Sequence, residues 1–130
     1  MNKRTGKTSK QDFAQFQKAV KEWMEFFGLY NWEYVFSHEE IKGFFAEVHW
    51  NIKGRIATFI LATELPDLQD CLEHFDVERI AFHEVCHLLF AKVDFLAESR
   101  NYSAAEMDME LHSLIRIFEK VIYKERQVNK

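Results

Sequence analysis

The stretch Ala81-Phe82-His83-Glu84-Val85-Cys86-His87-Leu88-Leu89-Phe90 decides how the rest of this chain is interpreted. It contains the pattern H-E-x-x-H, in which the two histidines are four residues apart. On a helix, two such residues lie about 40° from each other on one face, one turn apart. Their imidazoles can both reach one tetrahedral zinc ion, at bond lengths of roughly 2.0–2.1 Å. The spacing therefore predicts a metal site that includes His83 and His87.

Glu84 directly follows the first of these histidines, so its side chain is expected beside the metal rather than on it. A carboxylate in that place can take a proton from a zinc-bound water and return it to a leaving amine. The motif is short enough to occur by chance. The competing interpretation makes both histidines ordinary polar residues at a helix edge. Burying a His-Glu-His set without compensation is costly, however, and this favours the metal site.

The motif lies in a segment that is predicted to be a central, buried helix. Asp76 is the expected N-cap, and the helix is expected to run to about Ala97. A helix that is apolar nearly all round belongs in the interior of a protein. The apolar residues of this segment are Ile80, Phe82, Val85, Leu88, Leu89, Phe90 and Val93.

The segments on either side predict an α+β domain with the order α-β-β-β-α-α. Apolar residues at steps of three and four indicate a helix over about 10–27, with Ser9 as N-cap, Asp12 in the first turn and Gly28 at its end. Three aromatic, β-branched stretches then predict strands over 31–37, 43–50 and 55–63, the last two joined as a hairpin by residues 51–54, and a loop follows over 64–75. The final helix is expected to begin at Ser103, which forms a capping box with Glu106.

Length and composition fit one domain over 10–130 preceded by a flexible basic tail over 1–9. The 130 residues are 48% hydrophobic and 15% aromatic, which is enough apolar material for a core without disulfides. The two cysteines form no disulfide framework, and Cys86 is expected to be a reduced, buried thiol. His38, His49 and His74 have no ligand spacing and are treated as ordinary polar residues.

The charge and hydropathy of the chain also indicate which kinds of binding partner to expect. The net charge of −4 argues against a nucleic-acid partner, because the phosphate backbone favours a basic face. No stretch approaches the roughly 20 apolar residues that cross a bilayer, so no membrane association is expected. The N-terminus has no apolar stretch typical of a secretory signal, and the expected location is the cytoplasm of the host cell. The oligomeric state is not predicted.

A catalytic zinc site needs a third protein ligand, and the sequence offers several candidates after the motif. Val93 stands where the longer H-E-x-x-H-x-x-G-x-x-H pattern has its third histidine, so the ligand must come from further along the chain. Helix geometry favours Glu110, whereas ligand chemistry favours His112, and the pattern leaves both open. The full set of candidates is Glu98, Glu106, Asp108, Glu110 and His112.

Residues 81–90, together with Glu106-Met107-Asp108, the run from His112 to Glu119 and the hairpin over 46–61, resemble the compact metallopeptidases encoded by phages and prophages. These proteins are minimal zincins, with one helix, a short mixed sheet, the active-site helix and a closing helix. The resemblance implies His112 as the third ligand, with Glu110 as the alternative. It also implies that the strand over 55–63 pairs with an extended substrate by β-augmentation.

The expected function is therefore hydrolysis of a peptide bond by zinc-activated water, with Glu84 as general base and a peptide or protein as substrate. The main alternative is a non-catalytic protein of the same fold that uses zinc in assembly or regulation. A third interpretation is another zinc hydrolase, such as an amidase acting on cell-wall peptides. Tyr102 and Arg116 are weaker candidates for stabilising charge on a substrate carbonyl, since a loop aromatic and a solvated helix charge explain them equally well.

Overall fold

The computed structural model describes residues 6–66, 75–99 and 101–123. The first helix, α1 (Lys10–Phe26), begins where the sequence predicts it. The Ser9 hydroxyl accepts a hydrogen bond from the Asp12 backbone N–H at 2.9 Å, and the Asp12 carboxylate accepts one from the Ser9 N–H at 2.9 Å. This reciprocal capping box satisfies two backbone donors at the start of the helix. Gly28 follows the helix with a φ of 69°, a left-handed conformation that glycine adopts without strain.

The three predicted strands form one small mixed sheet. They are β1 (Glu33–Glu39), β2 (Ala46–Asn51) and β3 (Ile56–Ala62), in the order β1-β3-β2. β1 pairs with β3 in parallel, and β2 pairs with β3 in antiparallel orientation, which confirms the hairpin. In the hairpin turn the Asn51 side-chain carbonyl accepts a hydrogen bond from the Gly54 N–H at 2.9 Å.

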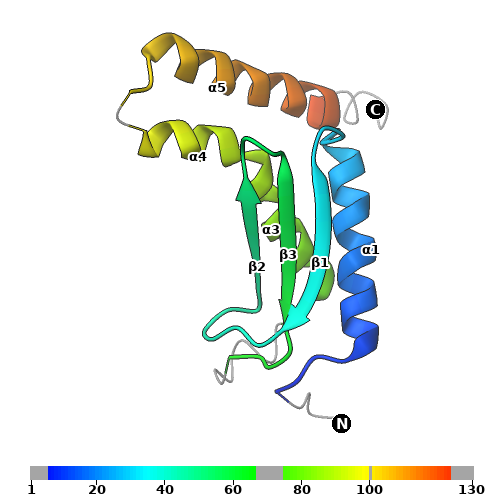
Figure 1. The fold of residues 1–130 in the computed structure, drawn as a ribbon. Coiled ribbons are helices and arrows are strands. Elements are labelled where there is room, and N and C mark those ends of the chain that lie inside the picture. Colours follow the sequence, from blue (N-terminus) through cyan, green and yellow to red (C-terminus); the bar gives the residue numbers. More distant parts are fainter. Residues whose placement is uncertain (1–5, 67–74, 100, 124–130) are drawn as a thin grey trace.

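The strand order corrects one expectation that the resemblance carried. β3, which corresponds to the strand predicted over 55–63, lies in the middle of the sheet and is hydrogen-bonded on both sides (Figure 1). Its backbone groups are therefore already paired and cannot add a further strand. Among the strands that the structure describes, β2 is an edge strand next to the motif helix.

The prediction of a single helix from Asp76 to about Ala97 is wrong in one respect, because this segment forms two helices. Asp76 caps α3 (Val77–Leu89) as expected, but α4 (Ala91–Glu98) follows as a separate helix. Phe90 separates them with φ −93° and ψ 5°, outside the helical range. Its ring packs against Phe118 of the last helix, with ring centroids 6.3 Å apart. A long-range aromatic contact thus lies at the break, and the local pattern contains no sign of it.

The last helix, α5 (Ala104–Phe118), starts at the predicted cap and continues as a π-helical turn over Glu119–Tyr123. The Ser103 hydroxyl accepts a hydrogen bond from the Glu106 N–H at 3.1 Å. α5 runs back beside α4, and the two helices project past the top of β2 as an arm (Figure 1). We call helices α4 and α5 together the α4–α5 arm. Within α5 only Leu114 is buried.

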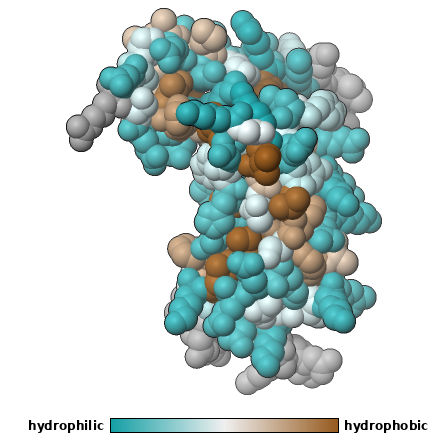
Figure 2. All heavy atoms as spheres, in the orientation of Figure 1, coloured by the Kyte–Doolittle hydropathy of each residue, from teal (hydrophilic) through white to brown (hydrophobic). Residues whose placement is uncertain are grey.

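One face of the sheet packs against α1 and α3 to form the hydrophobic core. The largest fully buried side chains come from α1, β3 and α3 and are Phe16, Phe59, Leu61, Leu88, Val20 and Val85. The opposite face is less covered, and Val35 and Ile56 are exposed on the strands. Figure 2 shows apolar atoms over the strands on this side, surrounded by hydrophilic ones. The α+β class predicted from the sequence is confirmed.

The first described residues are hydrogen-bonded rather than free. The Thr8 N–H donates to the Thr63 carbonyl at 2.9 Å, and Lys7 forms an isolated β-bridge with Glu64. Residues 1–5 of the tail predicted over 1–9 lie outside the described residues. So do residues 67–74 of the predicted loop, with Cys71 and His74 among them. Searching the described ranges for a helix that could span a membrane finds none.

Candidate metal centre

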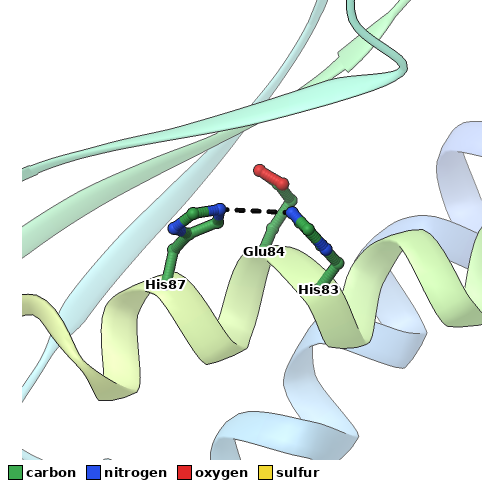
Figure 3. Close-up of side chains that lie close together, drawn as sticks. All are labelled: His83, Glu84 and His87. Carbon is green, nitrogen blue, oxygen red and sulfur yellow. Dashed lines mark hydrogen bonds between the residues drawn. The ribbon is translucent and has the colours of Figure 1, made fainter.

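Helix α3 presents His83, Glu84 and His87 on the side that faces the sheet. The two histidines are one turn apart, and their rings point toward each other above the helix (Figure 3). Glu84 extends between them toward the strands, and only 5% of its surface is exposed. The helical spacing that the sequence predicted therefore brings the three motif side chains together.

The distance between the two imidazoles matches the requirement of a metal ion. The Nε2 atoms of His83 and His87 are 3.2 Å apart. Two ligand atoms bound at roughly 2.0–2.1 Å to a tetrahedral zinc ion are about 3.3 Å apart. The ligand atoms of His83, Glu84 and His87 all lie within 4.8 Å of one another. These residues could hold a metal ion.

Glu84 is a buried carboxyl group with an altered acidity. Burial disfavours its charged form and raises its pKa to about 7, and the negative charge of Glu47 adds to the effect. A carboxyl group that titrates near neutral pH can both accept and donate a proton there. The position beside the two imidazoles and the raised pKa are typical of a proton-transferring group.

A cavity of about 660 Å³ lies between α3 and the edge strand β2. From α3 it is lined by Asp76, Arg79, Ile80 and the three motif residues, and from the β2 side by every residue from Gly43 to Trp50. Pro66 contributes as well. The motif side chains therefore face an open space bounded by a strand edge, where a ligand could approach them.

The structure does not bring the candidate third ligands of the last helix to this cavity. The His112 Nδ1 atom lies 2.9 Å from the carbonyl oxygen of Asp108, on the same helix, and 58% of the His112 side chain is exposed. The Glu110 carboxylate lies 3.7 Å from the Lys92 ammonium group of α4. Both residues belong to the α4–α5 arm, and neither is part of the group around His83 and His87. His112 as third ligand therefore stays a prediction from ligand chemistry and the resemblance.

The remaining candidates of the second half of the chain are also placed elsewhere. The Glu106 backbone N–H donates to the Ser103 cap of α5, Asp108 pairs with His112, and Glu98 is exposed at the end of α4. Neither Tyr102 nor Arg116 lines the cavity, and both are exposed. The suggested role of these two residues in stabilising a substrate carbonyl receives no support from their positions.

Three polar residues line the cavity although the sequence analysis either did not name them or, for His49, treated the residue as an ordinary polar one. They are Glu47 and His49 of β2 and Arg79 of α3. Arg79 lies four residues before His83, so the same helical spacing that relates the motif histidines could have indicated it. Glu47 and His49 are two residues apart on a strand, which places them on one face. Nothing in the sequence indicated that this strand lies beside the motif helix.

Cys86, inside the motif, is less buried than the sequence predicts. It is a free, half-buried cysteine, and burial raises the pKa of its thiol. The thiol is therefore protonated at neutral pH and is a poor nucleophile. It lines a second, apolar pocket together with Trp23, Phe27 and Phe82.

No protein-family model matches this chain, and no curated protein or solved structure shows significant similarity to it.

Proposed function

We propose that this protein is a zinc-dependent peptidase in which His83 and His87 bind the metal and Glu84 transfers protons. The observation that carries the proposal is the convergence of the two imidazoles to 3.2 Å beside a buried carboxyl group, inside an open cavity. The Nε2 atoms of His83 and His87 are as far apart as two ligands of one metal ion, and the Glu84 carboxyl group lies beside them, where it could transfer protons.

The metal would supply the Lewis acidity, since bound zinc lowers the pKa of a water molecule and polarises a carbonyl group. Glu84 would take the proton from the attacking water and give it to the leaving amine. The Glu84 carboxyl group is buried on α3, between the two exposed imidazoles. A carboxyl group with a raised pKa holds and releases its proton readily around neutral pH.

The edge of β2 supports a peptide as substrate. The Ala62 N–H donates to the Phe45 carbonyl at 2.9 Å, so Phe45 is in a hydrogen-bonded pair of the antiparallel ladder. Such pairs alternate along a strand. The backbone groups of Ala46, Val48 and Trp50 therefore point away from β3, toward the cavity. An extended peptide could pair with these groups and pass the motif side chains.

The test is cleavage of a quenched fluorescent peptide library by the zinc-loaded protein. Glu84→Gln should bind zinc as the wild type does and lose cleavage by at least about 100-fold, because an amide cannot accept the proton. Glu78→Gln is the matched control, since Glu78 is an exposed residue on the same helix, outside the cavity. Cleavage that persists in Glu84→Gln would contradict the assigned role.

The same measurement distinguishes the alternatives. Wild-type protein that binds zinc tightly but cleaves no peptide would favour a zinc-binding protein of assembly or regulation. Cleavage restricted to short cell-wall peptides would favour an amidase.

A further inference from the structure

Arg79 lies on the same face of α3 as the two motif histidines. It precedes His83 by four residues, so the two side chains leave the helix about 40° apart and one turn from each other. His87 continues this row by one further turn. All three residues line the cavity between α3 and β2. Within the row, Arg79 is the residue that the proposed metal site does not use.

The distance along the helix relates Arg79 to a substrate at the metal site. Four residues of a helix rise by about 6 Å. An extended peptide advances by about 3.3 Å per residue, so this rise corresponds to about two peptide residues. The arginine side chain is long and flexible, and it can therefore contact a group one or two residues from the bond at the metal.

The packing of β2 against α3 places Arg79 beside the course that a bound peptide would follow. The ring of Phe45, which directly precedes β2, contacts the ring of Phe75, just before α3, with centroids 5.7 Å apart. The two elements therefore begin side by side, and both run toward the α4–α5 arm (Figure 1). A peptide paired with the edge of β2 would pass the motif and Arg79 in turn.

The side-chain charge of Arg79 is not neutralised by another residue of the described ranges. Within these ranges no ion pair or hydrogen bond joins its guanidinium group to an acid. The nearby Asp76 carboxylate caps α3 and accepts hydrogen bonds from two backbone N–H groups, at 3.1 and 3.3 Å. The Glu47 Oε2 atom is 3.0 Å from the Nε2 atom of His49. An anion that enters the cavity can therefore pair with Arg79 without displacing either of these acids.

We propose that Arg79 determines the specificity of this site by binding a carboxylate of the substrate, one or two residues from the cleaved bond. The inference rests on the proposed function and names the class of substrate. A guanidinium group binds a carboxylate through two parallel hydrogen bonds, which fix its position as well as neutralise its charge. A peptide carries a carboxylate at its free C-terminus and on acidic side chains. The first source makes the protein a carboxypeptidase, and the second makes it an endopeptidase that prefers acidic residues.

The test compares three acetylated peptide libraries that differ only in their carboxylates, with cleavage followed by mass spectrometry. The first library has no acidic residue and ends in an amide, the second ends in a free carboxylate, and the third is amidated and contains one glutamate. Zinc-loaded wild type should cleave the second or the third library at least about 10-fold faster than the first, as charge-assisted hydrogen bonds allow. The cut should lie one or two residues from the carboxylate. The preferred library identifies the source.

Variants of Arg79 test whether this residue causes the preference. Arg79→Gln should cleave all three libraries within about twofold of the wild-type rate on the first library. Arg79→Lys should keep part of the preference, because an ammonium group has the charge but not the paired hydrogen bonds. Lys21→Gln removes a positive charge from an exposed position on α1 and is the matched control. Circular dichroism of each variant checks the fold.

Two results would overturn the inference. One is a carboxylate preference that Arg79→Gln keeps in full. The other is a loss in Arg79→Gln that is equally large on the first, uncharged library, because Arg79 would then act on the reacting carbonyl group rather than on a carboxylate.

A binding measurement separates this inference from the proposed function. Labelled peptides of each library are titrated with metal-free protein and followed by fluorescence anisotropy, so that the carboxylate cannot bind a metal ion instead. Peptides with the preferred carboxylate should bind at least about 10-fold more tightly than the uncharged ones, and Arg79→Gln should remove this difference.

The two measurements together assign each failure. If the wild type cleaves all three libraries equally, the assignment of Arg79 fails and the proposed function stands. If the wild type cleaves no peptide, the proposed function fails, and binding alone decides on Arg79. A carboxylate preference that depends on Arg79 then supports the inference, whereas equal binding of the libraries, or none, overturns it.

Discussion

The burial of Glu84 predicts that this residue destabilises the metal-free protein at alkaline pH. Its pKa is raised in the folded protein from the ordinary value of 4.5 to about 7. The folded state therefore holds the proton more tightly than the unfolded state does. Below pH 4.5 both states are protonated and no penalty exists. As the pH rises from 4.5 to about 7, the unfolded state loses its proton first, and the free energy of unfolding falls.

The magnitude follows from the size of the pKa change. At roughly 1.4 kcal/mol per pKa unit, the rise to about 7 corresponds to about 3 kcal/mol above neutral pH. Glu84→Gln removes the charge and keeps the shape, so it should raise the free energy of unfolding by up to about 3 kcal/mol at pH 8. The same substitution should have little effect at pH 4.5, where the carboxyl group of the wild type is protonated.

The assay is urea unfolding of chelator-treated protein, followed by tryptophan fluorescence at several pH values. For urea slopes of about 1–3 kcal/mol per molar, the midpoint of Glu84→Gln should exceed that of the wild type by roughly 1–3 M at pH 8. Glu22→Gln, an exposed substitution on α1, should differ from the wild type by less than about 0.5 kcal/mol. Adding Zn²⁺ should shrink the advantage of Glu84→Gln, because a nearby cation favours the ionised carboxylate. Equal stability of Glu84→Gln and wild type at pH 8 would refute the reasoning.

Three further predictions concern the metal, the core and the thiol. Saturating Zn²⁺ should raise the melting temperature of the wild type but not of His83→Ala, because an ion that binds only the folded state stabilises that state. Differential scanning calorimetry measures the melting temperatures of the two proteins. Phe59→Ala should lower the free energy of unfolding by about 3–5 kcal/mol in urea titrations, because Phe59 is fully buried on the central strand. Thr58→Ala, on the other face of that strand, should lower the free energy of unfolding far less. Cys86 should react with iodoacetamide at pH 7 at least about 10-fold more slowly than free cysteine, since burial raises its pKa, and equal rates followed by mass spectrometry would contradict its burial.

Local signals were sufficient for most elements of the fold. Ser9, Asp76 and Ser103 are each the N-cap of a helix, as predicted. These starts could be predicted because a capping side chain accepts hydrogen bonds from backbone N–H groups no more than three residues further along. The hairpin of β2 and β3 follows from the turn over 51–54 in the same way. The pairing of His83 with His87 is local too, since both residues lie on one helix and the helical repeat determines their separation.

These local signals could not predict contacts between segments that are distant in the sequence. The break at Phe90 coincides with a ring contact to Phe118, and the strand order, with β3 in the centre, depends on how β1 packs beside the hairpin. Ligand chemistry and the resemblance favoured His112 of the last helix as third ligand, whereas the structure packs that helix beside α4, and none of its residues lines the cavity. The motif helix and β2 are about thirty residues apart, and a helical or strand period carries no information over such a distance. The sequence alone determined that His83 and His87 lie one turn apart on a helix, because their spacing matches the helical repeat. Only the packing of β2 against α3 decided which residues line the cavity beside them.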